Sequence, residues 1–263
     1  MALQMSLPES GLLVGPSSDE GIPDLDWLHQ QLAIDKDIRL VTLVNPGNPS
    51  GVLLTREYVQ QVVDLCRQYD CWLILDVTYE YFIHETNQPK VFDGCFNEPH
   101  VIHIFSLSKS YALAGYRCGY LALHQEASGL YENMLKVQDT IPIAPSRIAQ
   151  VAGLGAVQNA GRPWVQEKVQ TLASGRQAIL QALRCLDQPI IGGSGAMYVM
   201  VKLPSAADDL EVGTMLVRDY GVAVIPGSFC GFPGWIRVCY SNLPPDQCLQ
   251  AAERLEAGLR SLL

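Results

Sequence analysis

The sequence predicts an α/β fold, in which a mostly parallel sheet with flanking helices is followed by a smaller α+β domain. Short runs of continuous apolar residues recur along the first half of the chain, and segments with helical spacing lie between them. Continuous rather than alternating hydrophobicity is typical of strands that are covered on both faces. The second half instead joins a long helical segment to three strand-like runs and a final helix.

Five apolar runs in the first half are predicted to be strands: 11–16, 38–44, 72–77, 101–107 and 118–123. Between the second and third runs, apolar side chains recur at positions i, i+3, i+4 and i+7, which is the spacing of one helix face. These side chains are Val59, Val62, Val63 and Cys66, and Thr55 stands before them as a candidate N-cap. The pattern indicates a strand, helix, strand crossover.

The second half is predicted to begin with one long helix at 161–186, whose inward face is formed by Val165, Val169, Leu172, Ile179 and Leu183. Strands are expected at 195–203, 222–227 and 235–241. A final helix should begin at Pro244 and Pro245, because proline favours the first helical positions, and bury Leu249, Ala252, Leu255 and Leu259. We divide the chain into a partial large domain at 1–162 and a small C-terminal domain at 163–263.

Composition disfavours several classes of protein. The 263 residues carry a net charge of −9 without a cluster of Lys and Arg, which argues against nucleic-acid binding. The eight cysteines form no C-x-x-C pair, which favours reduced thiols over a zinc site or a disulfide framework. No run of about eighteen apolar residues predicts a membrane span. We therefore expect a cytoplasmic protein without a metal site.

Polar side chains follow three of the predicted strands, namely Asn45, Asp76 and Ser106. In an open parallel sheet, ligands bind in the crevice outside the carboxyl ends of the strands. Each residue has an ordinary explanation when taken singly: "NPGNPSG" (45–51) suits a turn, Asp76 suits a helix cap, and a lysine such as Lys109 suits the surface. Gathered at one edge of a sheet, they indicate a binding site.

The chemistry of these residues suits a pyridine aldehyde phosphate. A lysine amine in a dry site forms a Schiff base with a carbonyl, and Lys109 is the candidate. Asp76 under the pyridine nitrogen would keep that nitrogen protonated. The remaining polar groups would bind the ring hydroxyl (Asn45, Tyr79) and the phosphate (Ser106, Arg117).

Five motifs in a fixed order resemble those of the pyridoxal-phosphate-dependent aminotransferases of class I/II, which have fold type I. They are "NPGNPSG" (45–51), "DVTY" (76–79), "SLSK" (106–109) with an arginine eight residues after the lysine, "PGSFCG" (226–231) and "IRVCYS" (236–241). The resemblance covers nearly the whole chain. It implies pyridoxal 5'-phosphate as the cofactor.

Carried over position by position, the resemblance makes Lys109 the Schiff-base lysine, which also moves the proton between the substrate Cα and the cofactor. Asp76 becomes the partner of the pyridinium nitrogen. Arg237 matches the arginine that grips the substrate carboxylate, since a planar guanidinium suits bidentate recognition. The other matches are Asn45 and Tyr79 for the ring hydroxyl, with Asn45 also near the substrate, and Ser106, Ser108 and Arg117 for the phosphate.

The resemblance implies amino-group transfer between an amino acid and a 2-oxo acid, in a homodimer. Two alternatives stay open. A lyase of the same fold, such as a carbon–sulfur β-lyase, would use the same cofactor residues. A non-catalytic truncated product would act by pairing with a full-length subunit.

The position of the asparagine motif predicts that the chain lacks the family's N-terminal part. In the family this motif follows on the order of a hundred residues, about one small domain, whereas here it begins at Asn45. The resemblance assigns to that part a phosphate-binding helix N-terminus, an aromatic side chain over the pyridine ring and two strands. One of these strands should lie between neighbours of the retained strands, so we expect unpaired backbone there unless the sheet closes up.

Overall fold

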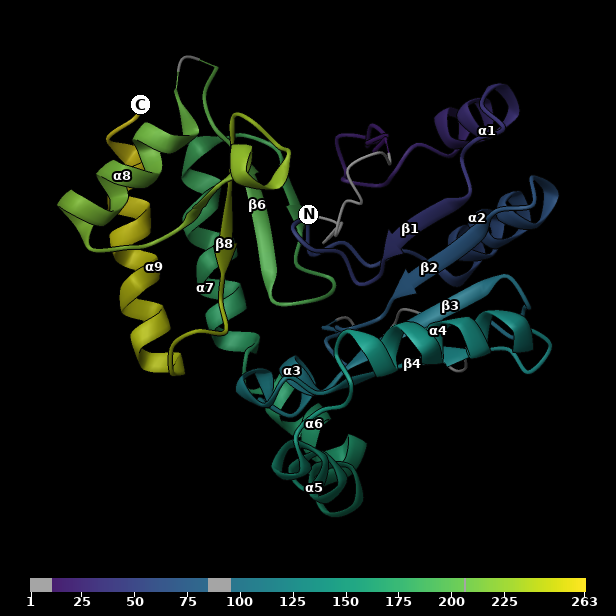
Figure 1. Cartoon of the computed structure of the whole chain (residues 1–263). Coiled ribbons are helices and arrows are strands. Elements are labelled where there is room, and N and C mark those ends of the chain that lie inside the picture. Colours follow the sequence, from purple (N-terminus) through teal and green to yellow (C-terminus); the bar gives the residue numbers. More distant parts are fainter. Residues whose placement is uncertain (1–10, 85–95, 206) are drawn as a thin grey trace.

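The computed structural model describes residues 11–84, 96–205 and 207–263 (Figure 1). Its named strands form two four-stranded sheets. The first has the order β1 (Leu40–Val44), β2 (Trp72–Asp76), β3 (Val101–Ser106), β4 (Gly119–Leu123). The second has the order β5 (Ile190–Gly192), β6 (Tyr198–Lys202), β8 (Trp235–Cys239), β7 (Ile225–Pro226). Figure 1 places the two sheets in separate halves of the molecule, and the predicted α/β class is confirmed.

The first sheet is parallel from β1 to β3 and antiparallel between β3 and β4. The prediction of a covered strand at 118–123 is therefore wrong in its environment: Gly119, Tyr120 and Leu121 are exposed. The segment 107–118 between β3 and β4 forms only single helical turns, and it returns the chain as an antiparallel neighbour of β3. Among the four strands of this sheet no gap is left, because β2 and β3 each pair on both sides, whereas β1 and β4 each pair on one side only.

The predicted strand at 11–16 is not formed. Leu12, Leu13 and Val14 are all more than half exposed, and the nearest pairing is an isolated bridge between Ser17 and Pro23. An apolar run becomes a strand only where another strand pairs with it. Helix α1 (Leu25–Ile34), which the sequence pattern did not reveal, follows and begins at an Asp24 N-cap.

Helix α2 (Arg56–Gln68) is confirmed in detail. Its N-cap is Thr55, whose side chain accepts a hydrogen bond from the Tyr58 amide, and its four predicted inward residues are at most 2% exposed. They belong to one apolar core with Leu73, Leu75 and Val77, which alternate along β2 and its exit. One face of the first sheet is therefore covered by α2.

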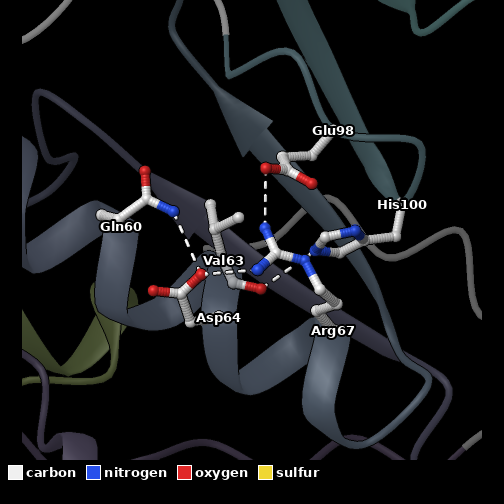
Figure 2. Close-up of polar contacts among 6 residues, drawn as sticks. All are labelled: Gln60, Val63, Asp64, Arg67, Glu98 and His100. Atoms are coloured by element: carbon white, nitrogen blue, oxygen red, sulfur yellow. Dashed lines mark hydrogen bonds and ion pairs between the residues drawn. The ribbon is translucent and has the colours of Figure 1, made fainter.

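Polar contacts also hold the entrance of β3 to α2 (Figure 2). Arg67 contacts Asp64 at 3.0 Å on its own helix and Glu98 at 2.6 Å on the segment before β3. The ring of His100 lies 2.9 Å from the Val63 carbonyl oxygen. Exposed ion pairs contribute little free energy each, but together these contacts fix where β3 starts and hence where its polar carboxyl end lies.

The connection between the two sheets is mostly helical. It begins with α4 (Ser128–Thr140), α5 (Arg147–Gly155), a π-helical segment (Ala156–Ala160) and α6 (Gly161–Gln170). The single-turn helix α3 (Leu107–Ser110) and a 3₁₀ turn (Ala114–Tyr116) instead lie within the first sheet, between β3 and β4. Helix α4 contains no buried residue. The predicted domain boundary after residue 162 falls inside α6.

The single helix predicted at 161–186 is two helices, because Thr171 and Leu172 form a turn between α6 and α7 (Ala173–Leu183). Leu172, expected to point inward, is half-buried, whereas the other four predicted residues are buried. A 3₁₀ turn (Arg184–Leu186) leads on to β5.

The second core forms where α7, α8 (Asp209–Tyr220) and α9 (Pro245–Arg260) cover the second sheet. The predicted start of α9 is correct, but Leu249 is 45% exposed and Cys248 is buried in its place. A 3₁₀ turn (Gly227–Cys230) links β7 to β8. None of the helices in the described ranges is long and apolar enough to cross a membrane.

Candidate active site

Asn45 begins the loop that leaves β1, and its environment is fully buried. Its backbone amide donates to the Asp76 carbonyl oxygen at 3.0 Å, which continues the β1–β2 ladder by one residue. The Asn45 side chain accepts from the Leu54 amide at 2.9 Å and donates to the Leu54 carbonyl oxygen at 3.1 Å. A carboxamide has two N–H groups, so one remains for a ligand. These bonds hold the loop 45–54 against the end of the sheet.

Asp76 is the last residue of β2 and lies beside Val44 and Ile104 on the neighbouring strands. One carboxylate oxygen accepts a hydrogen bond from the Thr78 amide at 2.9 Å, which shapes the turn that follows. This turn carries Tyr79 into the interior, where it is 4% exposed. Asp76 and Tyr79 thus reach the carboxyl edge of the sheet, as predicted.

Ser106 ends β3 and caps α3: its hydroxyl oxygen accepts from the Ser108 amide at 3.1 Å. Leu107 and Ser110 are buried and anchor this single helical turn, which leaves Lys109 half-buried just beyond the strand. Within the described residues, the Lys109 amine has no hydrogen bond or ion pair. A half-buried amine without such a partner is available to a ligand.

Arg117 is exposed and adopts a left-handed conformation, with φ of 53°. Its guanidinium donates to the Ala114 carbonyl oxygen at 3.0 Å, inside its own turn. Its neighbour Cys118 is close to α3, because the Cys118 carbonyl oxygen accepts from the Leu107 amide. The backbone therefore brings Arg117 beside Ser106 and Lys109, while the described residues show no side-chain contact between them.

Arg237 reaches the same region from β8 in the second sheet. Its Nη1 donates to Asn48 Oδ1 at 2.9 Å, and its Cζ lies 4.5 Å from the centre of the Tyr198 ring. Its Nε is buried and has no hydrogen-bond partner among the described residues. A buried donor left unpaired is costly, and a carboxylate would satisfy it.

Tyr198 and Asn48 are site residues that the sequence analysis missed. The Tyr198 hydroxyl lies 2.8 Å from the Tyr79 hydroxyl, and the two rings meet edge to face. On the sheet, Met200 pairs with Arg237, so Tyr198 is the diagonal neighbour of Arg237 on the same face. That register is the signal that would have found Tyr198, and it is not contained in the apolar run "GAMYVMVKL".

Burial controls the ionisation of the site tyrosines. Burial raises the pKa of Tyr79 well above its ordinary value, and the hydrogen bond with Tyr198 adds to the rise. Burial also raises the pKa of Tyr198. Both hydroxyls therefore keep their protons at neutral pH. On the same turn, burial raises the pKa of Glu80 to about 7, against the opposing charge of Arg162.

The arrangement thus combines an available amine, a carboxylate, buried hydroxyls and a guanidinium whose buried Nε has no partner among the described residues. The family model described as aminotransferase class I and II matches residues 17–255. The chain belongs to the class I and II aminotransferase family. Enzymes of this family depend on pyridoxal phosphate, so the predicted family and its cofactor are confirmed.

Individual aminotransferases show the same relationship. The chain is 37% identical to the aromatic aminotransferase ISS1 of Arabidopsis thaliana over 267 residues, which cover 100% of this chain and 66% of that protein. It is 27% identical to the aspartate/prephenate aminotransferase of Thermus thermophilus, covering 90% of this chain and 58% of that protein.

The fold agrees with a solved relative. The structure of Thermus thermophilus aspartate aminotransferase with maleate superimposes with a TM-score of 0.78 at 26% identity, covering 91% of this chain and 61% of that one. The chain therefore spans less than two thirds of the length of each of these relatives.

Proposed function

We propose that this chain carries out amino-group transfer between an amino acid and a 2-oxo acid, with pyridoxal phosphate bound through Lys109. The observation that carries the proposal is the buried, unpaired Nε of Arg237. Asn48 holds one end of the guanidinium and Tyr198 supports its face, so the Nε donor has a fixed place. Amino acids and 2-oxo acids share the carboxylate that such a donor recognises.

The residues at the strand ends fit pyridoxal phosphate. When bound, this cofactor supplies an aldehyde that condenses with amines and a ring that withdraws electrons. The free oxygen of Asp76 suits the ring nitrogen, where it would hold a proton. The second N–H of Asn45 and the hydroxyl of Tyr79 suit the ring oxygen. Hydroxyl and guanidinium donors, which suit a phosphate, come from Ser106, Ser108 and Arg117.

Lys109 has two tasks in this proposal. Its amine would hold the cofactor aldehyde, and when free of it the same amine would accept and return the proton of the substrate Cα. The short helix α3 restricts the movement of the Lys109 backbone, because Leu107 and Ser110 are buried on either side. The amine therefore moves by side-chain rotation alone.

Transfer is favoured over the alternative reactions because ISS1 and both Thermus relatives are named as aminotransferases. A lyase of the same fold would need the same residues but would release ammonia. We also infer a homodimer in the cytoplasm, divided into a large domain at 1–162 and a small domain at 163–263. Gel filtration with light scattering tests the dimer.

The test is the absorbance spectrum of the purified chain with pyridoxal phosphate, before and after borohydride. We expect a band that reduction fixes onto Lys109, located by peptide mass, and that is lost in Lys109→Ala. Lys136→Ala is the matched control, because Lys136 is an exposed lysine on α4. A folded chain that forms no band, or labels Lys136 equally, contradicts the proposal.

The reaction itself is tested by amino acid–2-oxo acid exchange. We expect exchange that requires both Lys109 and Arg237. Ammonia and pyruvate released from a cysteine-type substrate, without exchange, would instead support the lyase.

A further inference from the structure

Tyr198, the first residue of β6, links the two ends of the candidate site. Its hydroxyl lies 2.8 Å from that of Tyr79, and its ring lies under the guanidinium of Arg237, whose Cζ is 4.5 Å from the ring centre. Tyr198 is 7% exposed and Tyr79 is 4% exposed. Water therefore has little access, and each hydroxyl depends on the other.

The number of protons on the two hydroxyls limits how they can bond. Each hydroxyl has one proton to donate and two lone pairs. If Tyr79 donated to Tyr198, no proton of Tyr79 would remain for a ligand. If Tyr198 donates to Tyr79, the proton of Tyr79 is free to point at the ligand.

The charge of Arg237 favours the arrangement in which the Tyr198 hydroxyl donates to the Tyr79 hydroxyl. A cation over a phenol ring attracts its π-electrons and favours negative charge on the oxygen, which makes the hydroxyl a better donor. The guanidinium lies over the ring of Tyr198, whereas Tyr79 meets that ring edge to face, at an interplanar angle of 78°. Among the described residues, the other charged or titratable groups near this pair include Asp76, Cys230, Cys239 and Tyr240.

The ring of Tyr198 serves Arg237 in return. A guanidinium that stacks on an aromatic face is restricted to that plane. With Nη1 bonded to Asn48, the plane also fixes the direction of Nε, a buried donor without a partner among the described residues that a carboxylate would satisfy.

We propose that Tyr198 is a positioning residue that serves both ends of the site: its hydroxyl turns the Tyr79 proton toward the ring oxygen of the cofactor, and its ring holds Arg237 flat for the substrate carboxylate. The inference deepens the proposed function and rests on it. Tyr198 itself need not touch either ligand.

The first test is the pH midpoint of the absorbance change of bound pyridoxal phosphate. A donor to the ring oxygen favours its anionic form and lowers this midpoint. Tyr79→Phe should raise it, and Tyr198→Phe should raise it in the same direction by a smaller amount, about half a pH unit. Tyr240→Phe is the matched control: Tyr240 is a 1% exposed tyrosine of the same core, bonded to His84 and Ala196 instead. Its midpoint should equal that of the wild type.

The second test needs no cofactor and measures the affinity for maleate by calorimetry. Tyr198→Phe keeps the ring and should stay within about twofold of the wild type. Tyr198→Leu removes the ring and should weaken binding by about 5- to 30-fold, the range of a desolvated cation–π contact. Circular dichroism confirms that both variants fold.

The outcomes separate the two proposals. A wild-type chain that forms the Lys109 band, with Tyr198→Phe at the wild-type midpoint and Tyr198→Leu at the wild-type affinity, contradicts the inference and leaves the proposed function standing. A wild-type chain without the band overturns the proposed function and, with it, the part of the inference that concerns Tyr79. The maleate affinities still decide the part that concerns Arg237.

Discussion

Strands β6 and β4 differ sharply in how well the chain covers them. Four of the five residues of β6 are buried, whereas the first three residues of β4 are exposed. The same contrast runs through the site. At the proposed carboxylate end, Arg237 is held by Asn48 and Tyr198, but at the proposed phosphate end Arg117 is exposed and bonds only within its own turn in the described structure. The chain thus builds one end of its site with its own residues and leaves the other end open.

The largest effect, on the affinity for a carboxylate ligand, should come from the end of the site where Asn48 and Tyr198 hold Arg237. Arg237→Ala removes the guanidinium that a carboxylate would pair with, and losing such a buried charge partner costs about 2–5 kcal/mol, or at least about 30-fold in affinity. Maleate calorimetry measures it. Arg218→Ala, which removes an exposed arginine paired with Asp219, is the control. Equal affinities in both variants would mean that this end is not the carboxylate site.

Asn45→Ala should destabilise the fold by about 2–4 kcal/mol, because two hydrogen bonds are lost and the buried amide and carbonyl of Leu54 are left unpaired. Urea unfolding measures the change. Asn133→Ala on the exposed helix α4 should change the stability by less than about 0.5 kcal/mol. A comparable loss in both variants would refute the structural role of the Asn45 side chain.

Substitution of Glu80 should have a smaller effect on the free energy of unfolding, and this effect should depend on pH. Its pKa is raised from 4.5 to about 7 by burial, so the folded state favours the neutral acid. The stability that this provides is complete below pH 4.5 and is lost as the pH rises through 7. Glu80→Gln should therefore be more stable than the wild type at pH 8, by about 1–3 kcal/mol, and similar to it near pH 4.5.

Urea unfolding at the two pH values tests this, with Glu132→Gln as an exposed control. If the gap between Glu80→Gln and the wild type were the same at both pH values, the carboxyl group would not titrate as described.

The smallest effect on stability is expected from substitution of the exposed Arg117. Arg117→Ala should change the free energy of unfolding by less than about 0.5 kcal/mol, because the side chain is exposed. The affinity of this variant for pyridoxal phosphate should still fall about tenfold if the arginine binds the phosphate through charge-assisted bonds. A titration of the absorbance band decides this, and an unchanged affinity would remove Arg117 from the proposed site.

Local patterns in the sequence predicted local structure well. The Thr55 cap, the buried face of α2 and the polar ends of β2 and β3 each depend on residues that are close in the chain. The run at 118–123 does form a strand, β4, but its first three residues are exposed, and the run at 11–16 forms no strand. Both errors arise because hydrophobicity does not specify which strand lies next to a segment. The break at Leu172 and the exposure of Leu249 likewise depend on packing between helices.

The contacts that complete the site could not be predicted from such patterns. The hydroxyls of Tyr79 and Tyr198 meet across 119 residues of sequence, and Arg237 meets Asn48 across 189. These contacts require the second sheet to dock against the loop after β1, which carries Asn48, and against the turn after β2, which carries Tyr79. No periodicity or motif encodes that docking.

The long loop closed by Arg237 and Asn48 has a consequence for folding. Closing a loop costs entropy that grows with its length, and contacts distant in sequence tend to form late. Most of the second core comes from its own sheet and helices, but Tyr79, Phe82, Leu107 and Tyr111 of the first half also pack into it. The second core is therefore complete only when the two halves have docked. A carboxylate ligand binds only after the contact has formed and therefore stabilises the last step of folding by mass action. Ligand-induced thermal stabilisation thus measures whether the two halves have joined, even in a chain that does not turn over.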